Sequence, residues 1–112
     1  AINPVLVEGQ IEGGVAQGIG MALMEEFTPG RGENLHDYLI PTIGDVPPIT
    51  SILVERASSA GPFGAKGIGE QALIPTAPAI LNAIAHATGA RVTRTPATPE
   101  RVLAAIRSRR DP

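Results

Sequence analysis

A glycine-rich run at residues 61–70 constrains the fold of this chain more than any other feature. The run reads Gly-Pro-Phe-Gly-Ala-Lys-Gly-Ile-Gly-Glu, so four glycines precede a carboxylate, Glu70. Such a run is costly to order, because glycine loses more backbone freedom on folding than any other residue. Two interpretations follow. The run is either a surface turn with a solvated lysine and glutamate, which composition slightly favours, or a loop that lies against a ligand and presents Glu70 as a general base.

The run matches neither of the two common glycine-rich nucleotide motifs. A P-loop requires a serine or threonine after its lysine, but Gly67 follows Lys66. The dinucleotide fingerprint has the spacing G-x-G-x-x-G, whereas Gly64, Gly67 and Gly69 give G-x-x-G-x-G. The sequence therefore excludes both motifs for this run.

The composition is that of one folded domain. The chain has 112 residues, of which 43% are hydrophobic and 18% charged, so a packed core is expected. A net charge of −2 and an aromatic content of 3% argue against a nucleic-acid partner. The absence of cysteine excludes disulfides and thiolate metal sites within the chain. Since no apolar run is long enough to cross a bilayer, we expect no membrane span. The predicted location, a separate expectation, is the cytoplasm.

The first predicted helix covers residues 10–27, where apolar side chains recur at helical spacing. Residues 2–7, interrupted by Pro4, are predicted to form a short extended segment before it. Each glycine in the helix costs about 1 kcal/mol relative to alanine, so this glycine-rich helix needs a packing partner. We expect another backbone to approach it closely at its small residues. These glycines are Gly13, Gly14, Gly18 and Gly20.

Two further helices are predicted near the C-terminal end of the sequence. The first should begin after an N-cap at Thr76 and stop at Gly89. The second should begin after an N-cap at Thr98, with Pro99 at its first position.

The remaining segments predict a long loop and one or two short strands. Residues 28–48 are rich in proline and glycine and should form an irregular connector. Residues 49–56 have the composition of a strand, and residues 91–95 of a short strand or an extended link. The predicted fold is therefore α/β (α+β), with a glycine-rich helix, a long loop, one or two strands and two final helices.

The two histidines do not predict a metal site. His86 has no metal-binding residue at a suitable spacing, and His36 and the adjacent Asp37 point in different directions along the backbone. We expect no metal bound by side chains of this chain alone.

Three motifs in order resemble the molybdenum-binding subunit of the xanthine dehydrogenase and aldehyde oxidase family. Residues 3–4 (Asn-Pro) and 9–20 (Gly-Gln-Ile-Glu-Gly-Gly-Val-Ala-Gln-Gly-Ile-Gly) resemble a signature segment of that subunit. Residues 38–41 match its Tyr-x-Ile-Pro element, and residues 66–70 (Lys-Gly-Ile-Gly-Glu) match its catalytic loop. The resemblance covers residues 2–107 and implies that residues 1–112 are a single C-terminal fragment of a much longer molybdenum-cofactor-binding domain.

The resemblance implies that this chain is part of a molybdenum hydroxylase, an enzyme that oxidatively hydroxylates a heterocycle or an aldehyde. It implies that Glu70 is the general base. It also implies that Gln10, Gly67, Ile68 and Gly69 lie against a molybdenum–molybdopterin cofactor, in the cytosine dinucleotide or a similar form.

The resemblance also implies partners, because other parts of such an enzyme lie outside this sequence. These are the remainder of the molybdenum subunit, iron–sulfur and flavin subunits or domains, and a small-molecule substrate. The isolated chain is therefore expected to hold no cofactor and to be inactive. Gln71 stands where several relatives carry proline, at a position expected to help shape the substrate pocket. The alternative function is a cofactor-free structural or interaction module derived from the same domain.

Overall fold

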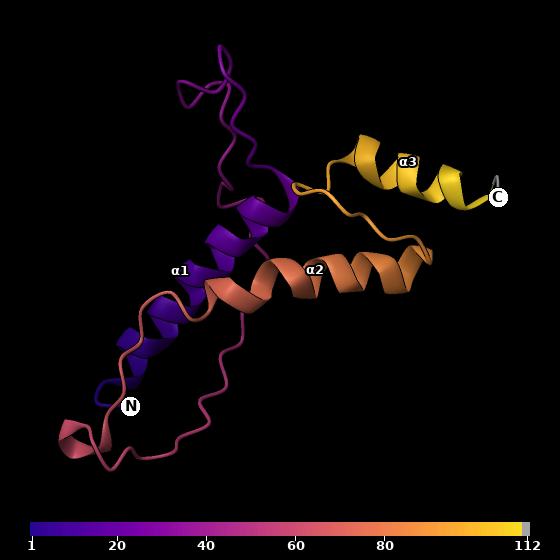
Figure 1. Ribbon diagram of the computed structural model, residues 1–112. Coiled ribbons are helices and arrows are strands. Elements are labelled where there is room, and N and C mark those ends of the chain that lie inside the picture. Colours follow the sequence, from indigo (N-terminus) through magenta and orange to yellow (C-terminus); the bar gives the residue numbers. More distant parts are fainter. Residues whose placement is uncertain (111–112) are drawn as a thin grey trace.

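The computed structural model describes residues 1–110 and is mostly helical (Figure 1). Long irregular segments join the helices. Within the described residues there is no strand, only an isolated antiparallel bridge between Thr28 and Arg31. The elements are α1 (Pro4–Leu23), the 3₁₀ turn η1 (Pro62–Gly64), α2 (Leu73–Thr88) and α3 (Pro99–Arg110).

The glycine-rich helix and the two final helices are confirmed, but the predicted strands are not formed. Residues 49–56 and 91–95 run without regular secondary structure. A strand persists only where a neighbouring strand takes up its backbone hydrogen bonds. Residues 1–110 supply no such neighbour for either segment. The β part of the α/β (α+β) prediction therefore finds no counterpart in this structure.

α1 begins at Pro4, so the prediction of an extended segment over residues 2–7 is wrong. The Asn3 side chain accepts a hydrogen bond from the Leu6 N–H at 3.2 Å and caps the helix. Pro4 stands in the first turn, where its missing N–H would have no helical partner in any case. An Asn-Pro pair therefore starts this helix.

α1 and α2 pack together where their small residues meet. Gly14 and Gly18 are buried in this contact. A Cβ on Gly14 would lie 2.9 Å from the Ala72 Cβ, and one on Gly18 would overlap the Thr76 side chain. The close approach of another backbone to the glycines of α1 is confirmed.

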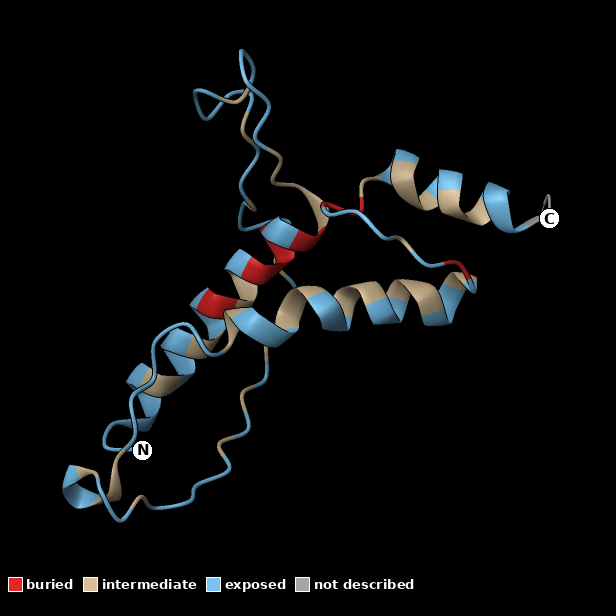
Figure 2. Cartoon of the chain, in the orientation of Figure 1, coloured by how far each residue is buried: buried red, intermediate tan, exposed pale blue. Residues whose placement is uncertain are grey.

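The core of the described part is small and lies around the C-terminal half of α1 (Figure 2). Its buried hydrophobic residues are Ile19 and Ala22 of α1 and Ala97, whose N–H donates to the Ala22 carbonyl. A fourth buried residue, Ala90, follows the C-terminal end of α2, away from α1 (Figure 2). Many large apolar side chains are instead exposed, among them Ile52 at 82% and Val54 at 86%. None of the helices in residues 1–110 is long and apolar enough to cross a membrane.

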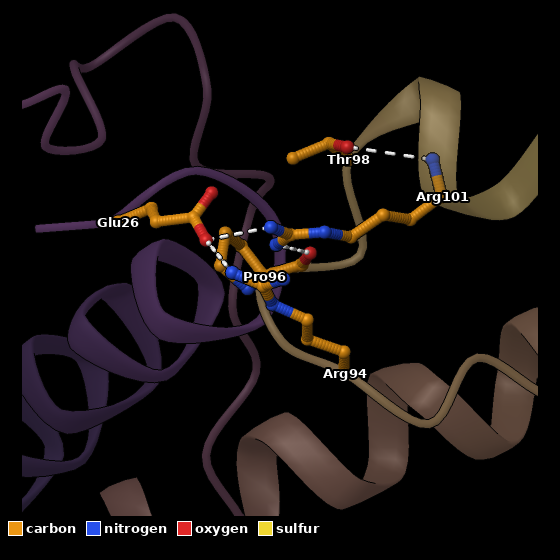
Figure 3. Close-up of polar contacts among 5 residues, drawn as sticks. All are labelled: Glu26, Arg94, Pro96, Thr98 and Arg101. Atoms are coloured by element: carbon orange, nitrogen blue, oxygen red, sulfur yellow. Dashed lines mark hydrogen bonds and ion pairs between the residues drawn. The ribbon is translucent and has the colours of Figure 1, made fainter. Parts of the chain in front are cut away.

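α1 ends at Leu23 rather than at residue 27, and two glutamates follow it. Glu25 accepts a hydrogen bond from the Tyr38 hydroxyl at 2.6 Å, which ties the connector to the end of α1. This hydrogen bond raises the pKa of Tyr38. Glu26 is paired with Arg94, which precedes α3, and with Arg101, in the first turn of α3 (Figure 3).

The ends of α2 and α3 show which capping signals were correct. α2 begins at Leu73, so Thr76 is not its N-cap; the Thr76 hydroxyl lies inside the helix and donates to the Ala72 carbonyl at 2.7 Å. Gly89 does end α2, with φ 69°. α3 starts after Thr98 as predicted, and the Thr98 hydroxyl accepts a hydrogen bond from the Arg101 N–H at 3.4 Å.

Candidate functional site

The site loop, residues 66–70, is the last part of the glycine-rich run and leads into α2. η1 comes just before it and ends at Gly64, whose φ of 75° is rarely adopted by residues with a side chain. Gly64 is therefore a glycine that the turn itself requires. After the turn, the chain passes beside the N-terminal half of α1 before α2 begins (Figure 1).

A hydrogen bond between two predicted site residues joins the site loop to α1. Gln10 Nε2 donates to the carbonyl oxygen of Gly69 at 2.9 Å, although the two residues are 59 positions apart. Both residues are exposed. The segment that contains Gln10 and the loop that ends at Glu70 therefore contribute to one open surface.

All five predicted site residues lie on this surface, and all five are exposed. Glu70 stands at the end of the site loop, and its carbonyl oxygen accepts a hydrogen bond from the Leu73 N–H at 3.1 Å. The first turn of α2 therefore holds the backbone of Glu70. The five residues are Gln10, Gly67, Ile68, Gly69 and Glu70.

Gln71 contacts the site loop more extensively than the sequence indicated. Its Oε1 accepts a hydrogen bond from the Gly69 N–H at 2.5 Å, and its Nε2 donates to the Gly67 carbonyl oxygen at 3.3 Å. The sequence assigned Gln71 to the substrate pocket and did not predict these bonds. An amide side chain directly after a glycine-rich run was the available signal, because both its polar atoms can reach nearby backbone groups.

The surface has the features that a flat, polar-edged group such as molybdopterin needs. A Cβ on Gly67 would meet no atom within 4 Å, and one on Gly69 would meet only Gln71 Oε1 at 4.0 Å. The space beside these glycines is open, so a ligand could approach the backbone without meeting a side chain. The Gln10 amide beside them can both donate and accept hydrogen bonds. These residues therefore fit the cofactor that the resemblance implies.

Other possible sites on the described residues are weak. Among residues 1–110, no three His, Cys, Asp or Glu side chains gather in a way that could hold a metal ion. A shallow hollow of about 460 Å³ lies between α1 and the connector, and no predicted site residue lines it. Its lining residues are Gly9, Glu12, Gly13, Ala16, Val46, Pro47 and Ile49.

The chain is similar to known molybdenum enzymes in sequence and in fold. Residues 1–47 match the family described as molybdopterin cofactor-binding domain. The chain is 42% identical over 107 residues to the xanthine dehydrogenase molybdenum-binding subunit of Escherichia coli O157:H7, covering 90% of this chain and 14% of that protein. The aldehyde oxidoreductase of Desulfovibrio desulfuricans matches with a TM-score of 0.88 at 44% identity, covering 92% of this chain and 12% of that one. Quinoline 2-oxidoreductase of Pseudomonas putida 86 matches with a TM-score of 0.80 at 42% identity, covering 95% and 14%.

These matches confirm the predicted family. The chain belongs to the family of molybdenum-dependent oxidoreductases that contains xanthine dehydrogenase and aldehyde oxidoreductase, and it corresponds to a segment of their molybdenum-binding subunit. It spans about 14% of the length of the first curated relatives. The chain therefore corresponds to a small part of a complete molybdenum-binding subunit.

Proposed function

We propose that this chain supplies the general base and one wall of the cofactor site in a molybdenum hydroxylase. The observation that carries the proposal is the hydrogen bond between Gln10 and Gly69. It brings the signature segment of α1 beside the residue that precedes Glu70. The bond supports a loop that is fixed against α1 rather than a turn that contacts only solvent.

In this proposal the five site residues have two tasks: four of them hold the cofactor, and Glu70 accepts a proton. The Gln10 amide and the bare backbone of Gly67, Ile68 and Gly69 hold a molybdenum–molybdopterin cofactor, in the cytosine dinucleotide or a similar form. When bound, this group supplies a Lewis-acidic, redox-active centre. Glu70 accepts the proton that the attacking oxygen nucleophile releases when a heterocycle or an aldehyde is hydroxylated.

The remainder of the molybdenum subunit is the proposed partner of the exposed apolar surface. Residues 49–56 carry Ile52 and Val54, both more than four-fifths exposed at 82% and 86%. We propose that this segment becomes a strand by pairing with a strand outside this chain, which would complete the predicted α/β arrangement. That residues 1–112 form one C-terminal segment of the subunit also stays a prediction.

Electron transfer and location remain further proposals. Iron–sulfur and flavin subunits or domains would accept the electrons, since this chain carries no cysteine with which to bind a cluster. A cytoplasmic location stays a prediction, which fractionation of the source cells would test.

The proposed function is tested by Glu70→Gln in the complete enzyme at full molybdenum content. The amide keeps the size of the side chain but accepts no proton at neutral pH. Glu8→Gln is the matched control: Glu8 is an exposed glutamate of α1, and residues two apart on a helix do not face each other, so it points away from Gln10. The proposal expects turnover to fall in the first variant and to stay unchanged in the second.

A further inference from the structure

We propose that Gln71 is a positioning residue for Glu70, because its amide fixes the backbone of the site loop from which Glu70 projects. The inference rests on the proposed role of Glu70 as the general base. It assigns to Gln71 a task that is separate from contact with substrate or cofactor.

The side-chain amide of Gln71 bridges two backbone groups of the site loop. Its Oε1 accepts from the Gly69 N–H at 2.5 Å, and its Nε2 donates to the Gly67 carbonyl at 3.3 Å. One planar amide therefore sets the separation and the relative orientation of two peptide groups. Both groups lie within three residues of Glu70.

Two other hydrogen bonds restrain the neighbouring backbone. Gln10 Nε2 donates to the carbonyl oxygen of Gly69 at 2.9 Å, so Gly69 is held at its N–H by Gln71 and at its carbonyl by Gln10. The Leu73 N–H donates to the Glu70 carbonyl at 3.1 Å. Gln71 thus completes a set of bonds that restrains the backbone on both sides of the Glu70 Cα atom.

The two glycines of the site loop explain why such a bridge is needed. Gly67 and Gly69 are not among the described glycines with a positive φ, and both have room for a Cβ within this chain. Their backbone therefore has access to many other conformations, and no packed side chain removes them. A general base works only when it lies within hydrogen-bond reach of the proton it accepts. The Gln71 amide supplies the restraint that the glycines themselves do not.

The test compares Gln71→Met with the unaltered protein in the complete, molybdenum-loaded enzyme. Methionine keeps the length and flexibility of the side chain but cannot make either hydrogen bond. Gln17→Met is the matched control, because Gln17 is an exposed glutamine of α1. Three quantities are measured: amide hydrogen exchange of residues 67–71, the limiting rate of enzyme reduction by substrate, and the substrate dissociation constant.

The proposal predicts faster exchange at residues 67–71 in Gln71→Met and a limiting rate lower by about 10-fold to 10²-fold, as expected for a misplaced catalytic group. The dissociation constant should change less than about 3-fold, because the loss falls on the transition state. Gln17→Met should change none of the three.

A double variant separates this proposal from the proposed function. If Gln71 acts through Glu70, adding Gln71→Met to Glu70→Gln should lower the rate no further. Suppose that Glu70→Gln is slow but that Gln71→Met shows either normal amide exchange at residues 67–71 or a normal limiting rate of reduction. That result overturns the role of Gln71 and leaves the base assignment intact. A normal rate in Glu70→Gln overturns the base assignment and the positioning role with it.

Discussion

Glu26 and Arg101 are paired between the end of α1 and the first turn of α3. Glu26 Oε1 accepts a hydrogen bond from Arg101 Nη2 at 2.6 Å and a second from Arg94 Nη2 at 2.9 Å (Figure 3). Arg101 Nη1 also donates to the Pro96 carbonyl at 2.8 Å. The hydrogen bond from Arg101, together with the charges of the two arginines, holds the pKa of Glu26 below its ordinary value. This pairing accounts for an acidic residue at a helix end where the macrodipole favours cations.

The lowered pKa of Glu26 predicts an acid-sensitive contact between α1 and α3. The stabilising effect is present above the ordinary carboxylate pKa and is lost as the pH falls through the lower, folded-state value. Glu26→Gln should therefore lower the melting temperature of the complete subunit near neutral pH, and the difference should shrink as the pH falls below the ordinary carboxylate pKa and through the lower, folded-state value. Thermal unfolding over this pH range measures the effect. A difference that stays constant with pH would contradict the assignment, and Glu8→Gln serves as the control.

The contact between α1 and α2 predicts opposite effects for neighbouring glycines. Gly14→Ala places a Cβ 2.9 Å from the Ala72 Cβ and 3.2 Å from the Leu73 backbone nitrogen. We expect it to destabilise the subunit by about 1–3 kcal/mol through overpacking. Gly13→Ala meets no atom within 4 Å and should stabilise α1 by up to about 1 kcal/mol. Denaturant unfolding of both variants provides the measurement, and equal effects would show that the helices do not approach as closely as described.

The exposed apolar side chains of residues 49–56 predict that the isolated chain self-associates. Ile52→Lys combined with Val54→Lys should make the isolated chain more soluble, because it removes two side chains exposed by 82% and 86%. The same pair of changes should prevent assembly of the complete subunit, since the segment would no longer dock. Size-exclusion chromatography measures both effects. Ser59→Lys, at an exposed polar position, is the control, and a monomeric unaltered chain at high concentration would contradict the prediction.

The sequence predicted well the features that depend on residues close together in the chain, such as helix ends. It predicted poorly the features that depend on a distant partner, such as strands. Gly89 and the Thr98–Pro99 pair act within one turn of helix, so capping rules were sufficient. Thr76 failed as an N-cap because α2 already begins at Leu73, where no capping side chain marks the start. Residues 49–56 have the composition of a strand but form none, because a strand needs a second strand to pair with and residues 1–110 do not supply it.

The candidate site was predicted from motifs, but its bonds were not. The family resemblance named Gln10 and Gly69 separately, and their hydrogen bond depends on how α1 lies beside the site loop. The contacts of Gln71 depend on the backbone path through Gly67 and Gly69, which a flexible glycine sequence leaves open.

The rate at which substrate reduces the molybdenum-loaded enzyme tests the central claim most directly. General-base assistance contributes about 10²-fold to 10⁴-fold, so Glu70→Gln should lower this rate by that factor. Molybdenum content should stay normal, because the glycines of the site loop and Gln10 are unchanged. If Glu70 is instead a solvated surface carboxylate, the variant should reduce at the normal rate and change stability by no more than about 0.5 kcal/mol. A Glu70→Gln enzyme with full molybdenum content and an unchanged rate would contradict the assignment of Glu70 as the general base.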